Sequence, residues 1–98
     1  MRERDIEAYL VKRVKALGGQ VRKVRWIGHR GAPDRLMMLG EQAVSLNYSR
    51  QGCTVWVELK ATGVQPEAHQ LREHDRMRTM GQRVEVVDSI EAVDELLA

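Results

Sequence analysis

The first part of the chain carries hydrophobic residues at helical spacing, with charged residues between them. The apolar positions are Ile6, Leu10, Val14 and Leu17. Residues three or four apart lie on one face of a helix, so this pattern predicts an amphipathic helix over residues 4–17. Gly18 follows directly and favours the end of the helix, because glycine readily adopts the left-handed conformation of a helix C-terminus.

Four short segments further along have the composition and alternation of β-strands. They cover residues 21–26, 35–39, 53–60 and 83–87. In the third segment, Trp56, Glu58 and Lys60 fall on one predicted face, since successive side chains of a strand point to opposite sides. The residues predicted on its other face are Val55, Val57 and Leu59.

Two further helices complete the predicted fold. One covers residues 66–80, between a proline that favours the first turn and a glycine that ends the helix. The other begins at Ser89, with Leu96 and Leu97 on its buried side. The strand–helix–strand order predicts that the third and fourth strands pair in parallel. We therefore expect one α/β domain over residues 1–98, with a central mixed sheet flanked by helices in the order α-β-β-β-α-β-α.

Residues 40–52 give the least clear pattern. In one interpretation, residues 43–46 extend a hairpin. The polar stretch at residues 47–52 is instead typical of an exposed turn or mobile loop.

The charge of the chain is unevenly distributed. Lys and Arg number 16 against 14 Asp and Glu, which gives a net charge of +2. Ten basic and four acidic side chains fall within residues 1–35, whereas residues 84–98 carry five acids and no base. A cationic half favours a polyanionic partner, although a solvated helix face gives the same pattern. The sequence has one cysteine, no secretory signal and no apolar run of membrane length, so we expect a cytoplasmic protein without disulfides or membrane contact.

Two acidic residues and a lysine are the candidate catalytic groups. Asp34 follows Pro33 at the start of a predicted strand, and Glu58 shares a strand face with Lys60. Carboxylates brought together at a sheet edge can hold a divalent cation such as Mg²⁺, and the main-chain carbonyl of Leu59 can supply a further oxygen. Such a cation activates water for attack on a phosphodiester, while a lysine neutralises the developing negative charge.

Each of these residues also has a purely structural interpretation. Pro-Asp is common in turns, so Asp34 alone is a turn residue more often than a metal ligand. Glu58 needs a partner if its strand is buried, and Lys60 alone could be that partner as an ion pair. The residues by themselves leave both interpretations open.

The ordered set of motifs resembles the PD-(D/E)XK nuclease superfamily. Pro33-Asp34 matches its first element and Glu58-Leu59-Lys60 its second. More narrowly, the chain resembles the virus-type replication-repair nuclease (VRR-NUC) domain in its standalone, phage-encoded form. The stretches that carry this resemblance are Gly31-Ala32-Pro33-Asp34-Arg35, Val57-Glu58-Leu59-Lys60-Ala61, Gly63, Pro66, Gln70 and Val84-Glu85-Val86-Val87-Asp88-Ser89.

The resemblance implies a restriction-endonuclease-like fold and a set of site residues. The implied catalytic residues are Asp34, Glu58, Lys60, Gln70 and Glu7, and the implied ligands of Mg²⁺ or Mn²⁺ are Asp34, Glu58 and the carbonyl of Leu59. Gln70 would help to position Lys60, water or the phosphate, and its structural alternative is a solvent-facing helix residue. A first-helix glutamate often joins the site in this superfamily; we choose Glu7, with Glu3 as the competitor.

The candidate DNA contacts gather around the loop before Asp34. They are Lys23, Arg25, His29, Arg30 and Arg35. Such donors bind phosphates and give position without sequence information. Trp26 beside them could stack on a base, although a core or interface tryptophan is the more common role. We interpret His69 and His74, on the predicted helix after the third strand, as surface residues.

Together these features predict a Mg²⁺- or Mn²⁺-dependent DNA endonuclease. The resemblance implies branched DNA, such as a four-way Holliday junction, as the substrate in a bacterial or phage-infected cell. Symmetric cutting of two strands needs two sites, which a homodimer supplies. Two other classes stay open: a non-catalytic nucleic-acid-binding module of the same fold, and a structural protein in which Glu58 and Lys60 form only an ion pair.

Overall fold

The computed structural model describes residues 1–40 and 53–98. Within these ranges the elements follow in the order α-β-β-β-α-β-α, as the sequence predicts. They are α1 (Glu3–Ala16), β1 (Gln20–Lys23), β2 (Arg35–Leu39), β3 (Cys53–Leu59), α2 (Ala68–Thr79), β4 (Val84–Val87) and α3 (Ile90–Leu96). The two interpretations of residues 43–46 and 47–52 concern a segment that lies outside the described residues.

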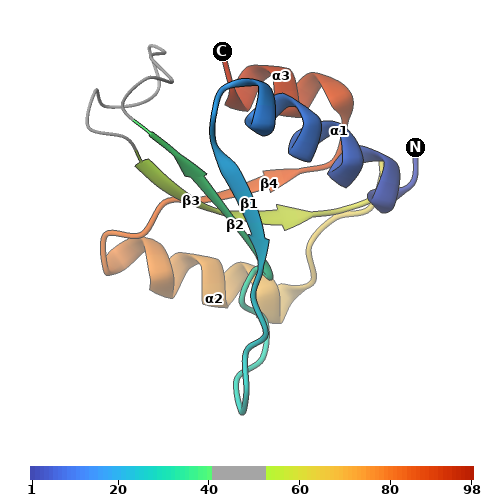
Figure 1. Cartoon of the computed structure of the whole chain (residues 1–98). Helices are drawn as coiled ribbons and strands as arrows, with labels where there is room; N and C mark the ends of the chain where they lie inside the picture. The colour runs from blue at the N-terminus through green and yellow to red at the C-terminus, as the bar shows by residue number, and fades with distance from the viewer. Residues whose placement is uncertain (41–52) are drawn as a thin grey trace.

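The described strands form one mixed sheet in the order β1-β2-β3-β4 (Figure 1). β2 pairs antiparallel with both β1 and β3. β3 and β4 pair in parallel, which confirms the prediction from the strand–helix–strand order. α2 is the crossover between them. β3 lies inside the sheet because it pairs with β2 on one side and β4 on the other.

The helices form a layer on each face of the sheet. α1 and α3 lie together on one face, and α2 lies on the other (Figure 1). The main hydrophobic core is on the α1 and α3 side, where Val55, Val57 and Leu59 of β3 are buried, as their alternation predicts. Burying one such side chain contributes about 1.5–3 kcal/mol to the free energy of unfolding. Glu58 points the other way, toward α2.

The first strand is shorter than its pattern predicts. The prediction for residues 21–26 was wrong at its end, because β1 stops at Lys23. One further ladder bond joins the Val24 N–H to the Asp34 carbonyl at 2.9 Å. Beyond it, the Trp26 indole N–H donates to the Pro33 carbonyl at 2.9 Å, which joins the two sides of the loop between β1 and β2.

The second helix begins at Ala68, two residues later than predicted. The side-chain Oε1 of Gln70 accepts the backbone N–H of Glu67 at 2.8 Å, as in a capping box, and so satisfies a donor at the start of the helix. In the described part of the chain, no helix combines the length and apolar character needed to cross a membrane.

Candidate active site

The strand register brings the two candidate carboxylates face to face. In the antiparallel β2–β3 ladder, Arg35 pairs with Val57 and Leu36 with Trp56. Continuing this register by one residue places Asp34 opposite Glu58. Residues directly opposite in a ladder share a face and have Cβ atoms about 4.5–5.5 Å apart. The register therefore brings Asp34 next to Glu58 at the end of the sheet where β2 begins, and the Asp34 carboxylate also pairs there with Arg35 at 2.8 Å.

Burial and charge both act on Glu58. Glu58 is only 7 % exposed, so it is buried and needs a partner, as expected for a glutamate in a buried strand. Burial raises the pKa of its carboxyl, the hydrogen bond and charge of His74 and the charge of Lys60 oppose that rise, and the negative charge of Asp34 adds to it. The negative charge of Asp34 near the carboxyl of Glu58 makes this end of the sheet a favourable place for a cation.

His74 is the partner of Glu58, and our interpretation of it as a surface residue was wrong. The residue is fully buried, and its Nε2 lies 3.0 Å from Oε1 of Glu58. Its Nδ1 has no hydrogen-bond partner within the described residues. α2 turns Glu73, His74 and Met77 toward the sheet. The spacing of His74 and Met77 was the available signal, because residues three apart share a helix face.

Lys60 follows β3 directly and is half-buried. Its backbone N–H donates to the Val87 carbonyl at 3.0 Å, which extends the parallel ladder by one residue. Alternation then puts its side chain on the face that Glu58 shares. Gln70, by contrast, uses its side-chain oxygen to cap α2.

Arg35 connects Asp34 with the first helix. Its side chain is 12 % exposed and lies between two carboxylates, pairing through Nε with Oε2 of Glu7 and through Nη1 with Oδ1 of Asp34 at 2.8 Å. Glu7 is thus linked to Asp34 through a guanidinium. Glu3 lines the same small hollow as Glu7 and Arg35, with a volume of about 250 Å³. Our prediction of Arg35 as a DNA contact did not include this bridge, because its partner Glu7 is 28 residues away in the sequence.

The other candidate DNA contacts lie on the surface near Asp34. Lys23, Arg25, His29 and Arg30 are all exposed. A hollow of about 510 Å³ is lined by Lys23, Val24, Arg25, Trp26 and Asp34. It brings cations and the carboxylate of Asp34 to one surface. His29 Nε2 also pairs with Oε2 of Glu73 at 2.8 Å, which fastens its loop to α2.

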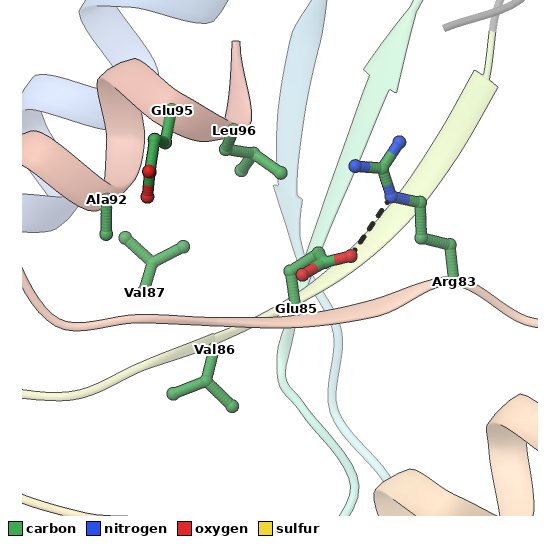
Figure 2. Close-up of a pocket in the computed structure, with 7 residues that line it drawn as sticks. All are labelled: Arg83, Glu85, Val86, Val87, Ala92, Glu95 and Leu96. Carbon is green, nitrogen blue, oxygen red and sulfur yellow. Dashed lines mark hydrogen bonds and ion pairs between the residues drawn. The ribbon is translucent and has the colours of Figure 1, made fainter. Parts of the chain in front are cut away.

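A separate hollow of about 430 Å³ lies beside β4 and α3 (Figure 2). Figure 2 shows Arg83 reaching Glu85 along β4, with Nε 3.2 Å from Oε1. Val87 and α3 border the hollow from above, while Val86 points to the opposite side of the strand. None of the residues predicted for the active site lines this hollow.

A Mg²⁺ or Mn²⁺ ion at this site would be held by only a few side chains of the protein. Within residues 1–40 and 53–98, no three His, Cys, Asp or Glu side chains lie close enough together to hold a metal ion. Mg²⁺ usually keeps several waters and is held by one or two carboxylates. The pair of Asp34 and Glu58 fits that requirement.

Comparison with known proteins places the chain in a family. No family model matches the sequence. The chain is 40 % identical over 89 residues to a protein described as "Putative nuclease p44" from Acyrthosiphon pisum secondary endosymbiont phage 1, covering 91 % of this chain and 85 % of that protein. It is also 40 % identical to a solved structure described as "VRR_NUC domain", with a TM-score of 0.79 over 97 % of this chain and 92 % of that one. On this evidence the chain belongs to the VRR-NUC family, as its motifs indicate.

Proposed function

We propose that the protein is a divalent-metal-dependent nuclease that hydrolyses phosphodiester bonds of DNA. The observation that supports this proposal is the β2–β3 register. Continued by one residue, it pairs Asp34 with Glu58, and strand alternation directs Lys60 to the same face as Glu58. Membership of the VRR-NUC family supports the same class of reaction.

Asp34 and Glu58 would hold Mg²⁺ or Mn²⁺, with the carbonyl of Leu59 and waters as the other ligands. Such an ion, when bound, polarises a phosphoryl oxygen and lowers the pKa of a bound water. The negative charge of Asp34 near the buried carboxyl of Glu58 supports this assignment, because a cation bound between the two residues would offset both charges.

The remaining residues of the site neutralise charge on the phosphate and hold the two carboxylates in position. Lys60 offers an ammonium to the negative charge that develops on the phosphate. His74, buried behind Glu58, holds the glutamate in one orientation through the 3.0 Å hydrogen bond. Gln70 caps α2 and so fixes the start of the helix that carries His74. Glu7 acts on Asp34 through Arg35.

We also propose branched DNA as the preferred substrate and a homodimer as the active form. The exposed cations Lys23, Arg25 and Arg30 beside Asp34 support a polyanionic ligand. One chain of this size offers one site, and cutting two strands of a junction symmetrically requires a second site from a second copy.

The proposal is tested by incubating the protein with single-stranded, duplex, flap and four-way-junction DNA, with Mn²⁺, with Mg²⁺ and with a chelator. Cleavage should require the metal and should be fastest on the branched forms. Lys60→Met serves as the control, because its backbone bond to β4 is kept while the ammonium is removed. It should stay folded, bind DNA and not cleave. Binding without cleavage by the wild type in any metal would instead identify a non-catalytic binding module.

A further inference from the structure

The loop between β1 and β2 forms an arm that projects from the sheet beside the candidate site. We define the arm as residues 25–33, the teal loop at the bottom of Figure 1. Ile27 is 89 % exposed, the largest exposed fraction among the large hydrophobic residues in the described ranges. A single exposed aliphatic residue is ordinary on a protein surface, but Ile27 lies in a loop whose flanking residues contact the rest of the protein.

The residues on both sides of Ile27 are anchored to the body of the protein. The ring of Trp26 packs against Trp56, with centroids 5.3 Å apart. On the other side, His29 pairs with Glu73 of α2 at 2.8 Å. The turn at Ile27 is therefore fixed at both ends, and its side chain points into solvent because its neighbours are committed to contacts.

Gly31 brings the returning part of the arm against α2. Its φ is +91°, a conformation that side chains with a Cβ rarely adopt. A Cβ at this position would lie 2.9 Å from the backbone oxygen of His69, closer than real Cβ contacts allow. The arm thus rests directly on the helix backbone, which adds a third anchor.

Positive charge surrounds the exposed isoleucine. Arg25 and Arg30 are exposed on either side of it, and residues 24–33 contain no Asp or Glu. The acids that face the arm are Asp34 at its base and Glu73, which is paired with His29. An apolar tip between two arginines matches nucleic acid, in which phosphates flank an apolar stack of bases. An apolar protein surface would be complementary to the isoleucine but not to the two arginines.

We propose that Ile27 is a wedge that enters the base stack of the DNA, while Arg25 and Arg30 bind the phosphates on either side. Aliphatic side chains that enter a base step partly unstack and kink the duplex. The hollow that is lined by both Arg25 and Asp34 joins the base of the arm to the candidate carboxylate of Asp34. This inference rests on the proposed function and specifies how the same site recognises its substrate.

Ile27→Ala tests the wedge, measured first in chelator so that binding is separate from cleavage. The DNA, duplex and four-way junction, carries 2-aminopurine, whose fluorescence rises when the base unstacks. Wild type should raise the fluorescence, whereas the variant should bind about tenfold or more weakly and leave the fluorescence low. Met80→Ala is the matched control, because Met80 is 71 % exposed near the opposite end of α2, and it should behave as wild type.

Arg25→Ala tests the phosphate contacts separately. Removing one phosphate contact should weaken binding to every DNA form and reduce the salt dependence of binding by a slope of about one. An unchanged salt dependence would overturn the assignment of Arg25.

The outcomes separate the wedge from the proposed nuclease. Wild-type binding and fluorescence in Ile27→Ala would overturn the wedge and leave the nuclease proposal standing. Unchanged DNA binding with an altered oligomeric state, measured by sedimentation, would overturn it in favour of contact between two copies of the chain. Loss of unstacking in Ile27→Ala, with no metal-dependent cleavage by the wild type, would uphold the wedge and overturn the nuclease.

Discussion

Replacing His74 by alanine should destabilise the protein far more than its place on a charged helix suggests. The histidine is fully buried, and its Nε2 lies 3.0 Å from a carboxylate oxygen of Glu58. Removing the partner of a buried polar group costs about 1–3 kcal/mol, and more when that group is charged. The lost ring also leaves a cavity behind it. We expect the free energy of unfolding to fall by about 3–4 kcal/mol.

The assay is urea unfolding followed by tryptophan fluorescence. His69→Ala is the matched control, because His69 lies on the same helix with a side chain that is 27 % exposed. It should cost about 0.5 kcal/mol or less. A double-mutant cycle with Glu58→Gln isolates the pair, since the neutral amide carries no charge to leave unpaired. The coupling energy should exceed about 1 kcal/mol.

Two results would refute this reasoning. One is a His74→Ala variant that loses no more stability than His69→Ala. The other is a large loss that is the same whether residue 58 is glutamate or glutamine. That second result would mean that the histidine only fills space and does not orient the carboxylate.

Two further predictions concern the anchors of the arm. Burial by itself raises the pKa of Glu73, but hydrogen bonds from His29 and a neighbouring arginine lower it below its ordinary value. A carboxyl with a lowered pKa stabilises the fold above the pKa of the unfolded chain and loses that contribution as the pH falls. Glu73→Gln should therefore be less stable than wild type near neutral pH, and the difference should shrink below about pH 4.3; a constant difference in urea titrations would contradict this. Gly31→Ala should lower the free energy of unfolding by about 1–3 kcal/mol in the same assay. Gly28→Ala is the control and should lower it less, because Gly28 has a positive φ but no atom within 4 Å of an added Cβ. Equal losses in the two variants would exclude the close approach of Gly31 to α2.

Residue alternation predicts the bounds and the buried faces of some strands but not of all. β2 has the predicted bounds, and the alternation in β3 correctly separates the core valines from Glu58. These succeed because a strand in this sheet must bury one face against α1 and α3. β1 ends at Lys23, whereas its residue pattern continues to Trp26, whose indole N–H donates to the Pro33 carbonyl.

The site was harder to predict than the fold, and its residues show why. The sequence places Asp34 and Glu58 at strand positions, but only the pairing register sets them opposite each other. His74 was missed because α2 carries charged residues on its buried face as well as on its exposed one. Arg35 was missed as a bridge because its two partners, Glu7 and Asp34, come from segments far apart in the chain.

Calorimetric titration with Mn²⁺ tests most directly whether the two carboxylates share an ion. The wild type should bind the ion, and Asp34→Asn and Glu58→Gln should each weaken binding about tenfold or more. The double variant should bind more weakly than either single variant, because it removes both carboxylate ligands of the same ion. Wild-type affinity in either single variant would contradict the account.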